Sequence, residues 1–179
     1  MDYAWPMRVV IFLLLSILAG AAAAGVIEGQ VIEVPDGDTV TVLARGGTSL
    51  HKVRLAGIDA PALSRPYGGS SRESLKRLLR GKTVRVEATA IDPKGRLVGT
   101  VVVLQDLQKC AETPCDGHLD PGLAQLNAGM ATLNKANLAF QTEDAQRRYA
   151  SAEAHARAQS LGLWRVPRAE RFAVRAAVH

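Results

Sequence analysis

Apolar and polar residues alternate along several short segments of the chain, beginning near residue 26. A period of two is typical of strands that bury one face of a sheet. Residues 26–34 and 39–44 flank an Asp-Gly pair, which is a strong hairpin signal between two alternating runs. Residues 50–58 alternate in the same way. We therefore expect the folded part of the chain to begin with three consecutive strands.

The next segment changes to a helical period. Between residues 70 and 81 the leucines fall on one helix face, and a glycine ends the pattern. Ser70 and Glu73 have the spacing of a capping box, so we expect this helix to begin at Ser70. Residues 83–91 and 96–104 return to a strand pattern, and the second of these runs is the more apolar.

Two more helices are expected towards the end of the chain. Asp120 is the expected N-cap of a short helix, with Pro121 at its first position and Gly129 as its stop. A longer helix is expected to begin near Thr142 and to close at Gly162. The order is an α+β arrangement with an all-β core. It favours an OB-fold barrel of five strands with three helices, although periodicity alone also allows another α+β sheet.

Residues 1–24 have the layout of a secretory signal peptide. Arg8 precedes an apolar run, and the alanines at 22–24 form a small-residue cleavage site before Gly25. An uncleaved membrane anchor is the alternative, but the apolar run is short for a bilayer span. We therefore expect cleavage before Gly25 and a secreted or periplasmic protein.

Charge adds a weaker indication. The formal net charge is +5 and the pI is about 9.6. Residues 165–179 hold four arginines and one glutamate, so this basic tail accounts for +3 of the total. Basic proteins tend to bind anions such as nucleic acid or acidic lipid. The tail either contacts such an anion or is a solvated end of the chain. Residues 25–164, which precede it, have the length of one domain.

The two cysteines agree with export. Cys110 and Cys115 bracket a short loop that contains a proline. In an oxidising compartment a local disulfide between them is the simplest interpretation. The alternative is a metal site formed by both cysteines and His118, which lacks an evident fourth ligand.

Three polar clusters lie at expected strand ends or in loops, where functional sites are commonly built. They are residues 36–38, 54–59 and 92–96. Asp38 and Asp59 supply carboxylates, the hard oxygen ligands that Ca²⁺ prefers. Arg54 and Arg96 supply guanidinium groups, which bind phosphate bidentately. Each cluster taken alone also has an ordinary explanation as turn or strand chemistry.

The order of these clusters carries more information than any one of them. "DGDTV", "VRLAGIDAP", "D-x-x-G-R" and a terminal helix ending in "GLW" resemble the staphylococcal nuclease-like (thermonuclease) family, from about Val26 to Trp164. The resemblance implies an OB-fold barrel with five strands and three helices. It also implies Ca²⁺-dependent hydrolysis of DNA and RNA phosphodiester bonds. Since no stable protein partner is indicated, we expect a monomer.

The resemblance also assigns roles to single residues. Asp38 and Asp59 match the calcium carboxylates, and Ala60 matches a position that offers its backbone carbonyl to the ion. Asp36 matches an acidic residue near the water shell of the ion. Arg54 and Arg96 match the two catalytic arginines.

The match breaks at the position of the general base. The family has a glutamate just after its Asp-x-Pro, and this chain has Ala62 there. Lys94 stands where the family has a tyrosine, and Lys135 lies in a segment that lacks the family's tyrosines; both lysines suit substrate phosphates. We expect a slow exported nuclease in which Asp36 substitutes as the base. The alternative is a nucleic-acid-binding module that has lost catalysis.

Overall fold

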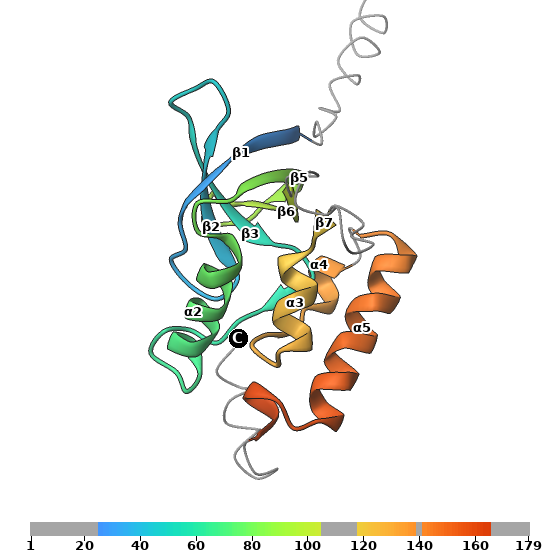
Figure 1. The fold of residues 1–179 in the computed structure, drawn as a ribbon. Coiled ribbons are helices and arrows are strands. Elements are labelled where there is room, and N and C mark those ends of the chain that lie inside the picture. The colour runs from blue at the N-terminus through green and yellow to red at the C-terminus, as the bar shows by residue number, and fades with distance from the viewer. Residues whose placement is uncertain (1–24, 105–117, 139–140, 166–179) are drawn as a thin grey trace, which may run out of the picture.

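The computed structural model describes residues 25–104, 118–138 and 141–165 (Figure 1). The predicted signal peptide, the predicted Cys110–Cys115 disulfide and the basic tail beyond Arg165 lie outside the described residues. Within the described ranges, no helix is both long enough and apolar enough to cross a membrane.

Five main strands form the core of the fold. They are β1 Gly25–Glu33, β2 Thr39–Ala44, β3 Leu50–Leu55, β5 Thr83–Ile91 and β6 Leu97–Leu104. Three two-residue strands, β4 Ile58–Asp59, β7 His118–Leu119 and β8 Thr132–Leu133, extend the pairing. The strand positions follow the pattern in the sequence closely. β5 buries alternate residues along one face, whereas β2 buries its first four residues on both faces.

The five main strands close into a ring. Antiparallel pairs join β3 to β2, β2 to β1, β1 to β5 and β5 to β6. A parallel pairing of β3 with β6 then closes the circle, with Arg54 opposite Val98. The predicted five-stranded barrel of OB type is therefore confirmed.

The barrel interior is built from small branched side chains. Fully or nearly fully buried members include Val31, Val40, Val42, Val53, Leu55, Val84, Val86, Val101 and Val103. Leu75 and Leu79 from a helix close one part of this core. The aromatic content of the chain is only 4%, and valine and leucine make up most of the core.

Helices cover the barrel on one side and at one end (Figure 1). They are α2 Gly68–Leu79, α3 Pro121–Asn127, α4 Lys135–Leu138 and α5 Glu143–Ala158, followed by the 3₁₀ turn η2 Gly162–Arg165. The three predicted helices are present as α2, α3 and α5. The short α4 and η2 were not expected, since four residues are too few for a periodic pattern.

Two helix boundaries differ from the prediction. α2 begins two residues before Ser70: its N-cap is Tyr67, in a left-handed conformation (φ 66°) and without a side-chain cap, so the predicted capping box at Ser70 and Glu73 is wrong. α5 begins as predicted after Thr142 but ends at Ala158. Gly162 opens η2 and does not close α5.

The third predicted strand, 50–58, is also interrupted. β3 ends at Leu55, and Gly57 takes a left-handed conformation (φ 78°) that reverses the chain. β4 then pairs with β8, with Asp59 opposite Thr132. This break matters for the site, because it turns Asp59 back towards the end of β3.

Candidate active site

The end of β3 and the start of β2 place three charged residues together. In the antiparallel β2–β3 pair, Thr39 lies opposite Arg54, so Asp38 precedes β2 directly beside the arginine. The turn at Gly57 brings Asp59 back to the same point. The Leu55 amide donates to the Asp38 carbonyl at 2.8 Å, which ties the loop before β2 to the end of β3.

One guanidinium joins the two aspartates. The Arg54 Nη2 group contacts Oδ1 of Asp59 and lies 3.3 Å from Oδ2 of Asp38. Both carboxylates are almost fully buried, whereas the Arg54 side chain keeps 19% of its surface exposed. The two predicted calcium carboxylates and one predicted arginine therefore form a single cluster that opens to solvent on the side of the arginine.

Asp38 carries the largest number of contacts in this cluster. Its Oδ1 accepts from the Thr39 hydroxyl at 3.0 Å, and its Oδ2 accepts from the Ala60 amide at 3.0 Å. Burial raises the pKa of Asp38 to about 6; the Arg54 guanidinium opposes this shift and the charge of Asp36 adds to it. A buried carboxylate with a raised pKa lacks full charge compensation, which a bound cation would provide.

Arg96 enters the same cluster from the turn between β5 and β6. Asp92 organises that turn: its Oδ1 accepts from the Lys94 and Arg96 amides at 2.9 Å, and its Oδ2 accepts from Arg96 Nε at 2.7 Å. Burial opposes ionisation of Asp92, but the hydrogen bonds and charge of Arg96 outweigh it and lower the pKa of this carboxyl. Arg96 Nη1 donates to the Thr39 hydroxyl at 3.0 Å.

A continuous polar network therefore runs through the site. It passes from Arg96 through Thr39 to Asp38, and from Asp38 through Arg54 to Asp59. These residues come from separate strands and turns, which the closed ring of strands brings to one end of the barrel.

The segment 36–38 is a turn whose backbone is fixed by its own side chain. Asp36 Oδ1 accepts from the Asp38 amide at 3.1 Å, the hydrogen bond of an Asx turn. The Asp36 side chain is only half-buried, whereas that of Asp38 is 6% exposed. Asp36 is thus close enough to Asp38 to influence its ionisation and remains accessible to water.

The donor set is suited to a hard cation. Asp38 and Asp59 direct carboxylate oxygens at one point, now compensated by Arg54, and carboxylate oxygens are the ligands that Ca²⁺ prefers. Among the described residues, no group of three or more His, Cys, Asp or Glu side chains is placed to hold a metal. Further ligands of an ion here would therefore have to be backbone carbonyls, such as that of Ala60, and water.

Three predicted positions stand apart from the network. Lys94 is exposed at the tip of the β5–β6 turn, and Lys135 is exposed at the start of α4. Ala62 is exposed in the loop before α2, where its carbonyl accepts from the Arg65 amide at 2.8 Å. The side chain at this position is the methyl group of Ala62, where the family that the sequence resembles has a glutamate.

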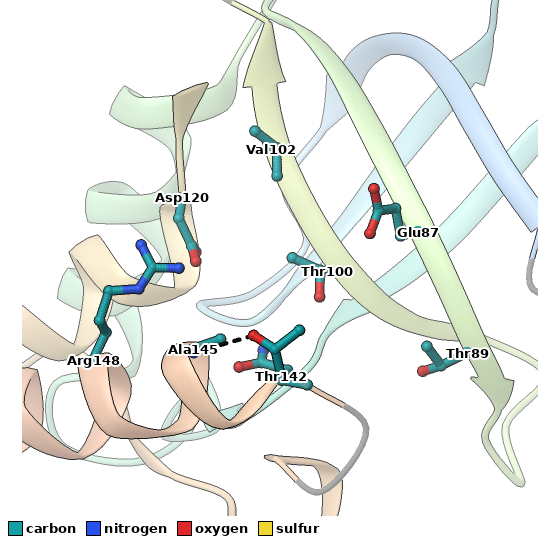
Figure 2. A pocket seen from close by; sticks show the side chains of 9 residues that line it. Glu87, Thr89, Thr100, Val102, Asp120, Thr142, Ala145 and Arg148 are labelled. Atoms are coloured by element: carbon teal, nitrogen blue, oxygen red, sulfur yellow. Dashed lines mark hydrogen bonds between the residues drawn. The ribbon is translucent and has the colours of Figure 1, made fainter. Parts of the chain in front are cut away.

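A cavity of about 290 Å³ lies elsewhere, between β5, β6 and the start of α5 (Figure 2). Its lining includes Glu87, Thr100, Asp120 and Arg148 but none of the predicted site residues. Beside it, the Tyr149 hydroxyl donates to Asp120 at 2.8 Å, and burial raises the pKa of both groups. This pair links α3 to α5 and is part of the scaffold.

Sequence reasoning missed two residues that organise the site, Thr39 within the network and Asp92 behind Arg96. Thr39 has the pattern of an ordinary strand residue, although its position directly after Asp38 is a usable signal. Asp92 has the pattern of turn chemistry, yet its four-residue spacing from Arg96 within a Pro-Gly turn indicates a carboxylate that holds the arginine.

Comparison with known proteins matches this chain to a nuclease family. A family model, Staphylococcal nuclease homologue, matches residues 52–166, which is more than half of the chain. The chain is 33% identical over 149 residues to the micrococcal nuclease of Shigella flexneri, covering 80% of this chain and 76% of that protein.

Two other relatives are named as endonucleases. The chain is 32% identical over 131 residues to the probable endonuclease LCL3 of Phaeosphaeria nodorum, covering 70% of this chain and 41% of that protein. It is 38% identical over 95 residues to an uncharacterized endonuclease of Escherichia coli O157:H7, covering 53% of this chain and 61% of that protein. The chain thus spans about half the length of these two relatives. With its closed barrel and its family match, it belongs to the staphylococcal nuclease homologue family.

Proposed function

We propose that this protein is an exported, calcium-dependent nuclease that hydrolyses phosphodiester bonds of DNA and RNA. One observation supports this most strongly: a single network joins Asp38, Asp59, Arg54 and Arg96, two carboxylates and two guanidinium groups. Export rests on the signal-like sequence of residues 1–24. The names of the relatives agree with a nuclease and leave its metal, substrate and location to be tested.

The arginines are the groups placed to receive a phosphate. Their side chains keep 19% and 15% of their surface exposed, whereas the carboxylates beneath them are nearly buried. Guanidinium forks bind phosphate oxygens bidentately and stabilise the charge that grows on phosphorus during hydrolysis. Asp92 holds Arg96 in position, so the fork is oriented before the substrate arrives.

Asp38 and Asp59 are the residues that would hold Ca²⁺, with the Ala60 carbonyl and water as further ligands. A bound Ca²⁺ would supply positive charge against the negative charge of the phosphate. With such an ion compensating the two aspartates, the Arg54 guanidinium, which now pairs with both of them, would be available to a phosphate. The chain would thus contribute the Arg54 guanidinium to phosphate binding.

Ala62 leaves the activation of water to another group. A positioned general base typically contributes about 10²–10⁴-fold, and charge stabilisation is often the larger effect. Asp36 is half-buried and beside Asp38, which makes it the best-placed carboxylate for this role. We therefore expect a slow enzyme.

The missing base also favours a second function. A binding module of the same family would keep phosphate contacts and lose turnover, and the exposed methyl group of Ala62 is the observation in its favour. The retention of both buried carboxylates beside both arginines favours catalysis, because buried acids weaken the binding of a polyanion unless a cation joins them.

The experiment that separates these functions compares the purified wild-type protein with Arg96→Ala. Single-stranded DNA and RNA are incubated with each protein in Ca²⁺ and in EGTA. Arg85→Ala serves as a matched control, because Arg85 is an exposed arginine that pairs with Glu28 away from the network.

A nuclease predicts calcium-dependent cleavage by the wild type and Arg85→Ala, and its loss in Arg96→Ala. A binding module predicts no cleavage by any of them, with DNA binding retained. Equal cleavage by all three proteins would indicate a contaminating nuclease and would contradict the assigned site.

A further inference from the structure

We propose that Gln125 is a positioning residue for the site: it fixes the loop Asp36–Asp38 through the carbonyl of Gly37. Gln125 holds the loop through hydrogen bonds that are present whether or not the protein is an enzyme. Its effect on catalysis rests on the proposed function, since it concerns the same carboxylate, Asp38.

Gln125 joins three segments that are distant in the sequence. It lies on α3 and is fully buried. Its Nε2 donates to the Gly37 carbonyl at 3.0 Å and to the Ser71 carbonyl at 3.0 Å, with the Ser71 hydroxyl at 3.3 Å. One amide group therefore connects α3, α2 and the loop that precedes Asp38.

The side chain does not serve packing alone. Its Oε1 is buried and has no hydrogen-bond partner within the described part of the chain. A buried acceptor without a partner destabilises the fold, and an apolar side chain of the same size would avoid this cost. The two donated hydrogen bonds are thus the physical reason for an amide at this position.

The loop has little room to choose another conformation. A Cβ on Gly37 would overlap the Ser71 hydroxyl and would come within 2.7 Å of Ala60 Cβ. Upstream, Arg72 Nε of α2 donates to the Val34 carbonyl at 3.0 Å. Arg72 therefore fixes the start of the loop, and Gln125 fixes the Gly37 carbonyl, which belongs to the peptide bond before Asp38.

The position of Asp38 depends on the Gly37–Asp38 peptide bond. The Asp38 carbonyl accepts from the Leu55 amide, and the Asp38 amide donates to the Asp36 carboxylate. If the Gly37 carbonyl lost its buried donor, the peptide would have to turn towards other donors, and both of these hydrogen bonds would weaken. Asp38 would then lose its alignment with Arg54.

The test measures amide hydrogen exchange in the full chain without Ca²⁺, so it does not depend on activity. Gln125→Leu removes both donors and keeps the side-chain size. Gln125→Asn keeps the polarity with a shorter reach and serves if the first variant fails to fold. Leu126→Val is the matched control, because Leu126 is the fully buried neighbour on α3 and makes no hydrogen bond to the loop through its side chain.

The readout is the exchange rate of the Asp38 and Leu55 amides relative to the amides of β5. We expect this ratio to rise at least about tenfold in either Gln125 variant, because the hydrogen bonds of both amides depend on the loop. In Leu126→Val the ratio should not rise, since general destabilisation speeds exchange through global unfolding and therefore acts on the β5 amides at least as strongly as on the loop amides. A ratio in the Gln125 variants equal to that of Leu126→Val would overturn the proposal.

A second readout concerns catalysis. With saturating Ca²⁺ we expect Gln125→Leu to lower kcat by about ten- to a hundredfold with little change in KM, because a small misplacement acts on the chemical step. If exchange rises and kcat does not fall, the loop is held by Gln125 but does not limit the reaction, which overturns the catalytic part. If the wild type itself does not cleave, the proposed function fails and exchange alone decides the positioning role.

Discussion

The Asp38 carboxylate sets the electrostatic character of the site. Burial raises its pKa to about 6, against an ordinary value of 3.8. The folded protein therefore binds this proton more tightly than the unfolded chain does. The contribution of Asp38 to the free energy of unfolding is greatest below about pH 4, and it declines as the pH rises from about 4 to about 6.

This predicts a pH dependence of stability that belongs to Asp38. In EGTA, the urea midpoint of the wild type should fall more steeply between about pH 4 and about pH 6 than that of Asp38→Asn, whose amide does not titrate. Glu73→Gln, a change on the exposed face of α2, should keep the wild-type slope. Identical slopes in the wild type and Asp38→Asn would contradict the assigned pKa.

Asp36 is predicted to be the substitute base. In Asp36→Asn the new side-chain carbonyl would still accept from the Asp38 amide, so this variant preserves the turn and removes only the proton acceptor. We expect kcat for single-stranded DNA in Ca²⁺ to fall by about 10²–10⁴-fold. A rate unchanged by this substitution, when Asp38→Ala abolishes cleavage, would exclude Asp36 as the base.

Among the elements, α2 packs against the loop before β2, where Arg72 contacts the Val34 carbonyl and Ser71 lies against Gly37. Two adjacent glycines at the start of α2 have opposite surroundings. A Cβ on Gly68 would overlap the carbonyl of Ala62, whereas a Cβ on Gly69 would meet nothing within 4 Å. The first glycine permits close approach of the loop, and the second is only a weak helix former.

The two glycines therefore predict opposite changes in stability. Gly68→Ala should lower the free energy of unfolding by about 1–3 kcal/mol, because the loop backbone must move. Gly69→Ala should raise it by about 0.5 kcal/mol through helix propensity. Urea denaturation of both variants measures the difference, and two changes of the same sign would be evidence against the packing described for this loop.

The sequence predicted strands better than helix ends. β2 and β5 lie at the predicted residues, and in β5 the alternation directly reports which side chains face the interior. The predicted start of α2 is wrong, because Tyr67 begins the helix from a left-handed conformation that no capping pattern encodes. The break after β3 escapes prediction for a similar reason: alternation continues through Gly57, and only its positive φ shows the turn.

In the site, the charged residues could be predicted from the sequence, whereas their hydrogen-bond partners could not. Asp38, Arg54, Asp59 and Arg96 are identified by the order of the motifs. That Thr39 connects Arg96 to Asp38 depends on strand register, which is a tertiary property. The role of Gln125 is likewise invisible in the sequence, because its partners lie on α2 and on the loop before β2.

At the scale of the whole molecule, closure of the barrel creates the site. The parallel pairing of β3 with β6 brings the β5–β6 turn, and with it Arg96, beside the β2–β3 hairpin. Lys94 lies in the same turn as Arg96, and Lys135 is the first residue of α4. We expect a nucleic-acid strand bound at the two arginines to pass both lysines. This arrangement makes the binding of nucleic acid testable by its salt dependence.

Each phosphate contact to a single strand contributes about 0.7 to the slope of log affinity against log salt. We expect Lys94→Ala and Lys135→Ala each to reduce the slope by about this amount, in fluorescence anisotropy with EGTA present. Lys82→Ala is the control, because Lys82 precedes β5 and lies at the end of that strand opposite Lys94. Equal slopes for all variants would exclude the two lysines as phosphate contacts.

A calcium titration of single-stranded DNA cleavage by the wild type and Asp59→Asn decides whether these carboxylates hold a catalytic ion. We expect the wild-type rate to rise with Ca²⁺ to a plateau and to vanish in EGTA, because both carboxylates are needed to hold the ion. Asp59→Asn should need much more Ca²⁺ or should not cleave. A wild-type rate that is the same in EGTA, or an unchanged calcium dependence in Asp59→Asn, would contradict a calcium-dependent nuclease site built on this network.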